Sequence, residues 1–386
     1  MIKKATFLII LVLISLALVY PYSDKDYLIL GQEEGEGMLI LPTRIKEGPD
    51  GNIYVLDQGD AFIKIYSPEG KYLRRIAGNG QGPGEIQRAD GANFGFTPED
   101  KLFFTESFGG HRWITILELT GKVDRLVHLD FKEHFGISEA FAMKDGGFLL
   151  DVWFGSRPEI HKDYFLYRYP ESLIRVDSAG KVTSEIVKTE YLKTISSVGT
   201  GGDQWIPFFP AFSWIVIEND LLLFADGLSR ELKIYDFKGN IANELKTDLP
   251  QPARVRDGDL EEWRRLREGA FTDKSLFNRI GRVIYKYKES VYKSKPNLAS
   301  ISSTPDGNIL VTGPYREGKE REFWLLNEDG KTVIKIGVQS YAVGISKHFV
   351  FLMVIDKEEN RLAICQKRVG KEDEDLLRAR TIGLAD

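Results

Sequence analysis

Residues 49–57 read Pro-Asp-Gly-Asn-Ile-Tyr-Val-Leu-Asp, and they open a unit that runs on to residue 71. A turn at 58–60 follows, then the apolar run Phe62-Ile63-Lys64-Ile65-Tyr66, then a second turn at Ser67-Pro68-Glu69-Gly70-Lys71. Asp-Gly and Glu-Gly pairs provide the positive φ that tight hairpin turns require, and β-branched and aromatic residues favour strands. The unit is therefore predicted as turn, strand, turn, strand, turn.

The same order of turns and apolar runs recurs along the chain. Four further copies open at Thr97-Pro98-Glu99-Asp100, Lys144-Asp145-Gly146-Gly147, Glu218-Asn219-Asp220 and Thr304-Pro305-Asp306-Gly307. A degenerate sixth copy runs through 349–352 and 361–364. Such a period indicates units that bury their faces by stacking on one another.

The spacing of the copies favours a propeller. Residues 27–370 without a helical-looking insert at 253–295 leave about 50 residues per copy, enough for a four-stranded blade. A ring of such sheets protects their edges, whereas solenoid repeats are shorter and more regular in length. We therefore predict an all-β fold, a six-bladed β-propeller with a small helical insert between blades 4 and 5.

A short segment ahead of each turn is predicted as the innermost strand of its blade. Small residues recur in these segments, as expected where six strands crowd one axis. A strand near 27–30 is expected to close the ring by completing the last blade. The candidates for side chains that line the axis are Arg44, Asn93, Glu139, Ser213 and Ser300.

The first 23 residues form a separate segment. Lys3 and Lys4 precede an uncharged, mostly aliphatic run over 5–20, which as a helix would span about 24 Å, short of the roughly 30 Å of a bilayer core. That length favours a cleaved signal peptide over an uncleaved anchor, and both readings export the chain to the periplasm or the outside of the cell. The predicted organisation is 1–23 signal peptide or anchor, 24–370 propeller and 371–386 C-terminal tail.

The composition narrows the classes of partner. The 52 Lys and Arg against 57 Asp and Glu give a net charge of −5, which argues against nucleic acid as a partner. The single cysteine, Cys365, excludes an internal disulfide and a cysteine-based zinc site. We expect contact with a membrane only through the N-terminal segment, if it stays uncleaved.

The first copy resembles an NHL repeat in the run 50–57, in Ile63-Lys64-Ile65-Tyr66 and in the glycine-rich tail 78–85. His111-Arg112 in the second copy matches a His-Arg pair common in that repeat. The chain is similar to exported bacterial six-bladed propellers with NHL-like repeats, a group largely without assigned activity. The resemblance implies a fold more than a function. NHL-like propellers include RNA-binding modules, sensor domains and a metal-dependent lyase, and related propellers include calcium-dependent lactonases.

The sequence gives little support for catalysis. The five histidines, His111, His128, His134, His161 and His348, form no metal-binding pattern, and none lies on a predicted inner strand. Asn93 and Glu139 suit calcium, but Arg44 in the same layer has the wrong charge. No Gly-x-Ser-x-Gly motif is present, and the glycines of 78–84 lack the ending of a phosphate loop. We expect no cofactor, with calcium as the open alternative.

Two features stand out as candidate binding surfaces. The insert 253–295 holds 12 basic and 7 acidic residues and is predicted as two amphipathic helices. An aromatic-rich stretch precedes it, which either packs between blades or forms a binding rim: Trp205, Phe208, Phe209, Phe212 and Trp214. We predict a non-catalytic binding module for a protein, peptide or carbohydrate, with a metal-dependent hydrolase or lyase centred on the axis as the alternative.

Overall fold

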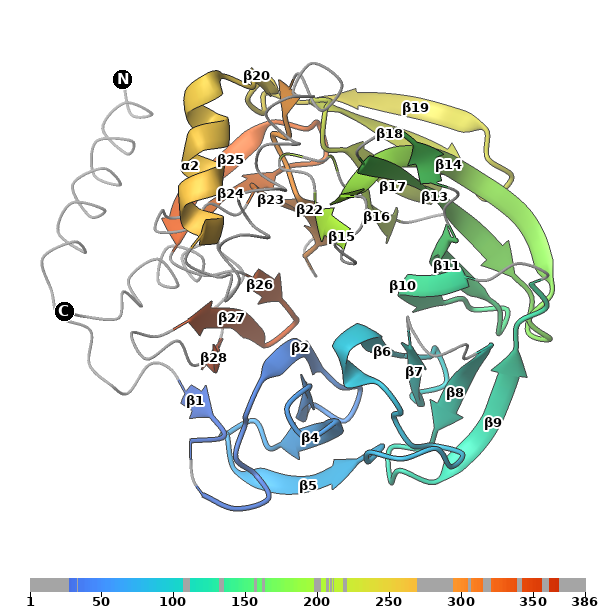
Figure 1. Ribbon diagram of the computed structural model, residues 1–386. Coiled ribbons are helices and arrows are strands. Elements are labelled where there is room, and N and C mark those ends of the chain that lie inside the picture. The colour runs from blue at the N-terminus through green and yellow to red at the C-terminus, as the bar shows by residue number, and fades with distance from the viewer. Residues whose placement is uncertain are drawn as a thin grey trace, which may run out of the picture.

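The computed structural model is a β-propeller whose sheets are arranged in a ring around a central axis (Figure 1). It describes residues 28–367 apart from 33, 107–111, 132–134, 156–157, 162–163, 198–202, 206–207, 209, 211, 218–220, 269–293, 305–306, 315–320, 339–341 and 356–360. The predicted N-terminal segment and C-terminal tail therefore lie outside the described residues. No helix among those described is long and apolar enough to cross a membrane.

Five sheets are regular and have four antiparallel strands each. The first sheet is β2 (Pro42–Glu47), β3 (Ile53–Asp57), β4 (Phe62–Tyr66) and β5 (Tyr72–Ile76), and the second is β6 (Ala92–Phe96), β7 (Leu102–Glu106), β8 (Trp113–Leu117) and β9 (Val123–His128). The fourth is β16 (Phe212–Ile217), β17 (Leu221–Asp226), β18 (Glu231–Asp236) and β19 (Ile241–Lys246), and the fifth is β22 (Ser300–Ser303), β23 (Ile309–Thr312), β24 (Arg321–Leu326) and β25 (Thr332–Val338).

The third sheet differs from the predicted four-stranded copy, because it has six strands. It consists of β10 (Phe135–Ala142), β11 (Phe148–Phe154), β12 (Pro158–Ile160), β13 (Tyr164–Val176), β14 (Val182–Ser197) and β15 (Asp203–Trp205). Strands β13 and β14 are 13 and 16 residues long and continue beyond β11, so β12 and β15 pair with their far ends.

The closing sheet joins the two ends of the described chain. It contains β26 (Ala342–Ile345), β27 (Phe349–Ile355) and β28 (Arg361–Lys367), and its fourth strand is β1 (Leu28–Leu30). β1 pairs antiparallel with β28, with Leu28 opposite Cys365. The expected closure by a strand near 27–30 is thus confirmed.

The turn chemistry predicted from the repeats explains these hairpins. Gly51, between β2 and β3, has φ of 76°, and Gly70, between β4 and β5, has φ of 81°. The second sheet has no glycine at the first of these turns, and Asp100 takes the left-handed conformation there with φ of 59°. Asp tolerates this conformation better than most residues, so the hairpin keeps its register.

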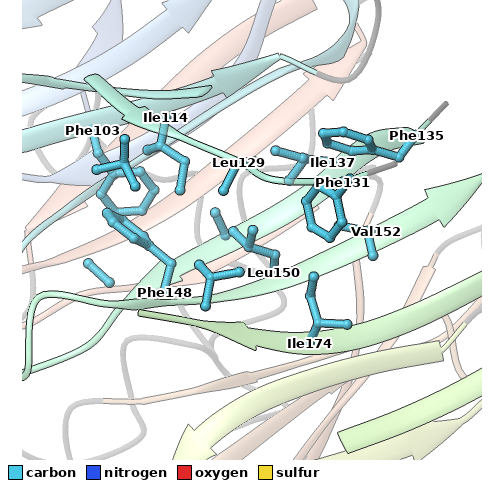
Figure 2. Close-up of a cluster of buried hydrophobic side chains, with 14 of the residues drawn as sticks. Phe103, Ile114, Leu129, Phe131, Phe135, Ile137, Phe148, Leu150, Val152 and Ile174 are labelled. Carbon is cyan, nitrogen blue, oxygen red and sulfur yellow. The ribbon is translucent and has the colours of Figure 1, made fainter. Parts of the chain in front are cut away.

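The core is a series of apolar layers between successive sheets. One layer joins the second and third sheets, and its rings Phe103 and Phe148 meet edge to face at 5.2 Å between centroids (Figure 2). Other layers join the first sheet to the second, the third to the fourth, the fourth to the fifth and the closing sheet to the first. Each sheet therefore depends on its neighbours for burial.

The predicted helical insert is described in part. Helix α2 (Asp257–Glu268) follows β20 (Ala253–Arg254), which pairs with β21 (Ser294–Lys295) at the return of the chain. Asp259 accepts a hydrogen bond from the backbone N–H of Arg256 and pairs with Lys295 at 2.8 Å. The described part of the insert is one short helix, and the second predicted helix falls within 269–293, outside the described residues.

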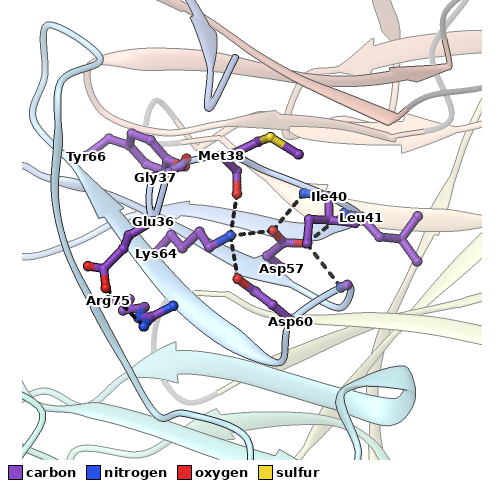
Figure 3. A network of polar contacts seen from close by, with 11 residues as sticks. Glu36, Gly37, Met38, Ile40, Leu41, Asp57, Asp60, Lys64, Tyr66 and Arg75 are labelled. Carbon is purple, nitrogen blue, oxygen red and sulfur yellow. Dashed lines mark hydrogen bonds and ion pairs between the residues drawn. The ribbon is translucent and has the colours of Figure 1, made fainter. Parts of the chain in front are cut away.

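A buried polar network fixes the segment before β2 to the first sheet (Figure 3). The Lys64 ammonium lies 2.8 Å from Asp57 and 2.7 Å from Asp60, and it also donates to the carbonyl of Met38. Asp57 accepts backbone N–H groups of Ile40 and Leu41 at 2.8 and 2.7 Å. This network orients the chain as it enters the innermost strand.

Candidate functional site

The strand register places four of the predicted axis residues at equivalent positions of their inner strands. In four sheets, a backbone N–H group closes the first hairpin turn, and it belongs to Gly48, Thr97, Met143 and Thr304 in turn. Four residues before each of these lies an axis candidate, in the same order Arg44, Asn93, Glu139 and Ser300. Their partners on the second strands are Leu56, Thr105, Asp151 and Thr312. Ser213 of β16 joins this set through hydrogen bonds to Ile301, the neighbour of Ser300. We call Arg44, Asn93, Glu139, Ser213 and Ser300 the axial layer.

A second layer lies two residues further along the same strands. Alternate residues of a strand face the same side, so Lys46, Gly95, Phe141 and Ser302 share the side of the axial layer. Phe141 is unusual here, since it is 43% exposed although it belongs to the innermost strand of its sheet. Sequence reasoning missed Lys46 and Phe141, although their period-2 spacing from Arg44 and Glu139 was a signal for both.

The charges of these layers interact across the ring. Desolvation lowers the pKa of the half-buried Lys46, the Glu139 carboxylate opposes that shift, and the Arg44 guanidinium adds to it. Lys46 and Glu139 belong to the first and third sheets, so this electrostatic effect acts between two different sheets. The Lys46 ammonium also lies 5.9 Å from the ring centroid of Phe94 on β6, whereas Arg44 is exposed.

Asn93 carries the least satisfied polar group of the axial layer. It is 2% exposed, and among the described residues neither its Nδ2 nor its Oδ1 has a hydrogen-bond partner. Thr105 lies opposite Asn93 on β7 and is also buried, and its hydroxyl likewise has no hydrogen-bond partner among the described residues. A buried polar group without a partner costs about 1–3 kcal/mol, so Asn93 and Thr105 lower the stability of the fold at this position.

The two serines of the axial layer contribute differently. The Ser213 hydroxyl accepts the N–H of Ile301 at 3.0 Å and donates to its carbonyl at 3.4 Å. Ser213 therefore joins β16 to β22 and has a structural partner already. Ser300 is half-buried at the same level.

Two of the five residues of the candidate aromatic rim pack between blades, which is the alternative that the sequence left open. Phe212 and Trp214 are 8% and 5% exposed and belong to the apolar layer between the third and fourth sheets, because β16 turns them toward that core. Phe208 is half-buried with φ of 60°, and Trp205 lies on β15 opposite Thr194. Phe209 lies outside the described residues. A ligand role for Trp205 and Phe208 stays a prediction.

The described part of the chain contains no group of three or more His, Cys, Asp or Glu side chains that could hold a metal ion. His348 contacts Glu47, His161 contacts Glu159 at 3.0 Å, and His128 is exposed on β9. His111 and His134 lie outside the described residues. The glycine-rich stretch 78–84 closes on itself, since Glu85 accepts the N–H of Gly82 at 2.7 Å.

Comparisons with known proteins concern the fold. The sequence matches no family model and no curated protein. Solved structures with a similar fold include an exported protein of Bacteroides fragilis, at 10% identity over 91% of this chain and 98% of that one, with a TM-score of 0.46. Another is virginiamycin B lyase of Staphylococcus aureus, at 11% identity over 88% of this chain and 98% of that one, with a TM-score of 0.44. A third is a gluconolactonase of Xanthomonas campestris, at 10% identity over 86% of this chain and 87% of that one, with a TM-score of 0.45. Similarities this distant carry no information about function.

Proposed function

We propose that this chain is an exported, non-catalytic binding propeller that recognises a protein, peptide or carbohydrate ligand through the face where its axis opens. The observation that carries the proposal is Phe141, an exposed aromatic ring two residues after Glu139 on the innermost strand β10. Exposed aromatic rings next to a few convergent polar groups are typical of ligand sites. We expect neither a cofactor nor a nucleic-acid partner.

We also propose that the propeller has six blades. The six-stranded third sheet has its own innermost strand, β10, with the same position relative to its turn as β2 and β6. We therefore count it as a blade, which with the five four-stranded sheets makes six and agrees with an NHL-like propeller. Export is inferred from the N-terminal segment 1–23.

The alternative function is a metal-dependent hydrolase or lyase with its centre on the axis. Asn93 and Glu139 are oxygen ligands of the kind that calcium prefers, and the Asn93 amide lacks a partner within the described residues. Arg44 and Lys46 oppose a cation at the same level, because both are positive. We therefore rank the alternative second.

The test is a binding screen with the purified full-length chain. Thermal-shift measurements with short peptides and with neutral and acidic oligosaccharides should show that at least one probe raises the melting temperature of the protein. Mass spectrometry after incubation should show that this probe is chemically unchanged. Phe141→Ala should weaken that binding at least about fivefold, since an aromatic anchor contributes on the order of 1–2 kcal/mol or more. Ile160→Ala is the matched control, because Ile160 is an exposed apolar residue of the same sheet on β12.

Three outcomes would contradict the proposal. No stabilisation by any probe would show that the axial face is not a general ligand site. Equal effects of Phe141→Ala and Ile160→Ala would place the site elsewhere. A cleaved probe, together with a metal found by elemental analysis of the purified protein, would favour the enzyme.

A further inference from the structure

We propose that the axial and second layers together bind a carboxylate group of the ligand, held between Arg44 and Lys46 and hydrogen-bonded by the Asn93 amide. This inference rests on the proposed binding function and names the chemistry of its ligand. The carboxylate can come from the free end of a peptide or from an acidic sugar, and the two sources are distinguished by experiment.

The two cations are placed to share one anion. Arg44 and Lys46 lie two residues apart on β2, so their Cα atoms are about 7 Å apart on one side of the strand. In the described part of the chain, neither of them forms an ion pair within 4.0 Å, although the structure has close pairs elsewhere, such as Lys64 with Asp57. A carboxylate has two oxygens and can accept from a guanidinium and an ammonium together.

The charge of the layers selects a singly charged group. Arg44, Lys46 and Glu139 are the charged side chains that the axial and second layers contribute, and they sum to +1. Asp151 lies opposite Glu139 but is buried on β11, one strand further from the axis. One carboxylate would neutralise this sum, whereas a phosphate group, with about −1.5 to −2 charges, would leave the site negative.

Asn93 adds a hydrogen bond at the same level. It occupies on β6 the position that Arg44 occupies on β2, and these two innermost strands are neighbours in the ring. Its amide is buried, and within the described residues neither its Nδ2 nor its Oδ1 has a hydrogen-bond partner. An oxygen of the carboxylate would accept from Nδ2, and a neighbouring N–H or O–H of the ligand would donate to Oδ1.

The test uses two matched pairs of probes in calorimetry with the full-length chain. One pair is an N-acetylated tripeptide with a free carboxyl end and the same tripeptide as the carboxamide. The other pair is a galacturonic acid disaccharide and its methyl ester. In at least one pair the acid should bind about tenfold tighter than its neutral form, and the pair that responds identifies the source of the carboxylate.

Variants locate the contact. Arg44→Met and Lys46→Met should each weaken binding of the acid about tenfold and leave the neutral probe unchanged, and Arg44→Lys should retain most of the affinity. Glu139→Gln should tighten binding of the acid, because it removes the one negative charge of the layers. Lys71→Met, at an exposed outer turn of the same sheet, is the matched control and should change nothing.

The outcomes separate this inference from the binding function on which it rests. Equal affinity for acid and neutral probes, or unchanged binding of the acid by Arg44→Met, overturns the carboxylate assignment and leaves the binding function standing. A chain that binds none of the four probes at millimolar concentration contradicts both.

Discussion

Lys64 is a cation at a position of β4 that is 1% exposed, and it is tolerated because its charge is fully compensated. Two aspartates, Asp57 and Asp60, and the carbonyl of Met38 surround its ammonium group. Removing one partner of a buried ion pair leaves the other partner desolvated and unpaired. Replacing Lys64 should therefore destabilise the fold mainly because the Asp57 carboxylate would stay buried without a cation. The lost attraction between the two charges is the smaller part of the effect.

We predict that Lys64→Met lowers the free energy of unfolding by about 3–5 kcal/mol, measured by urea denaturation. Arg168→Met is the control, because Arg168 pairs with Glu159 at 3.8 Å with both side chains about half exposed. Exposed pairs contribute about 0–1 kcal/mol, so this variant should stay close to the wild type. A Lys64→Met protein as stable as Arg168→Met would show that the network has no net stabilising effect.

The strand on which a residue lies was predictable from sequence where its distance from a hairpin turn decides it. Arg44 and Glu139 were assigned to innermost strands because both lie shortly before a hairpin turn, and they do lie on β2 and β10. Trp214 could not be assigned from sequence, because an aromatic cluster looks alike whether it lines a rim or fills a core. Only the neighbouring sheet decides, and β16 turns Trp214 toward the core it shares with the third sheet.

At the scale of elements, Glu47 connects the end of β2 to the turn between β26 and β27. It accepts the backbone N–H of His348 at 3.1 Å and also contacts the His348 ring. Partial burial of the carboxylate raises its pKa, but hydrogen bonds from Ser346 and His348 outweigh burial, so the pKa of Glu47 lies below its ordinary value of 4.5. A carboxyl group with a lowered pKa stabilises the fold at pH values above 4.5, and this stabilisation is lost as the pH falls through the folded-state pKa.

We predict that Glu47→Gln destabilises the protein at pH 7 by about 1 kcal/mol and that the difference from the wild type shrinks below pH 4.5. Thermal unfolding at pH 7, 5, 4 and 3 measures this difference. Glu99→Gln, at an exposed turn of the second sheet, is the control. A gap between wild type and Glu47→Gln that stays constant from pH 7 to pH 3 would contradict the assignment.

The hairpin of β13 and β14 is the element that sequence reasoning described least well. Pro170 and the charged residues around it interrupt the alternation of apolar and polar residues that marks a strand. The structure nevertheless carries the pairing through, with Pro170 opposite Glu190 and three register shifts along the hairpin. Tertiary pairing therefore overrides local preference here, which a pattern along one strand cannot reveal.

At the scale of the whole molecule, the propeller followed from the sequence because turn chemistry is local and repeats. Each copy specifies its own hairpins, and stacking is the remaining way to bury their faces. The side chains that line the axis were only partly predictable, because they come from strands about fifty positions apart in the chain. The chemical identity of a guest depends on their combined charge and spacing, which no single copy encodes.

We predict that β1 is needed to close the ring. A chain beginning at residue 24 should keep the melting temperature of the full-length protein. A chain beginning at 31 should lose at least about 3 kcal/mol of stability, because it removes the buried Leu30 and leaves one edge of β28 unpaired. Thermal denaturation with light scattering measures both effects. Equal melting temperatures for the two chains would show that the ring is held without β1.

The pairing of β1 with β28 also has a mechanical consequence. The chain enters β1 at Leu28, opposite Cys365, and leaves β28 two residues later at Lys367, so both connections emerge at the same end of the pair. A force that separates the two ends would load the hydrogen bonds of this pair one after another, as in opening a zip, instead of shearing them all at once. The junction should therefore be the first part of the ring to yield under tension, opening between β1 and β28 while the other sheets keep their packing.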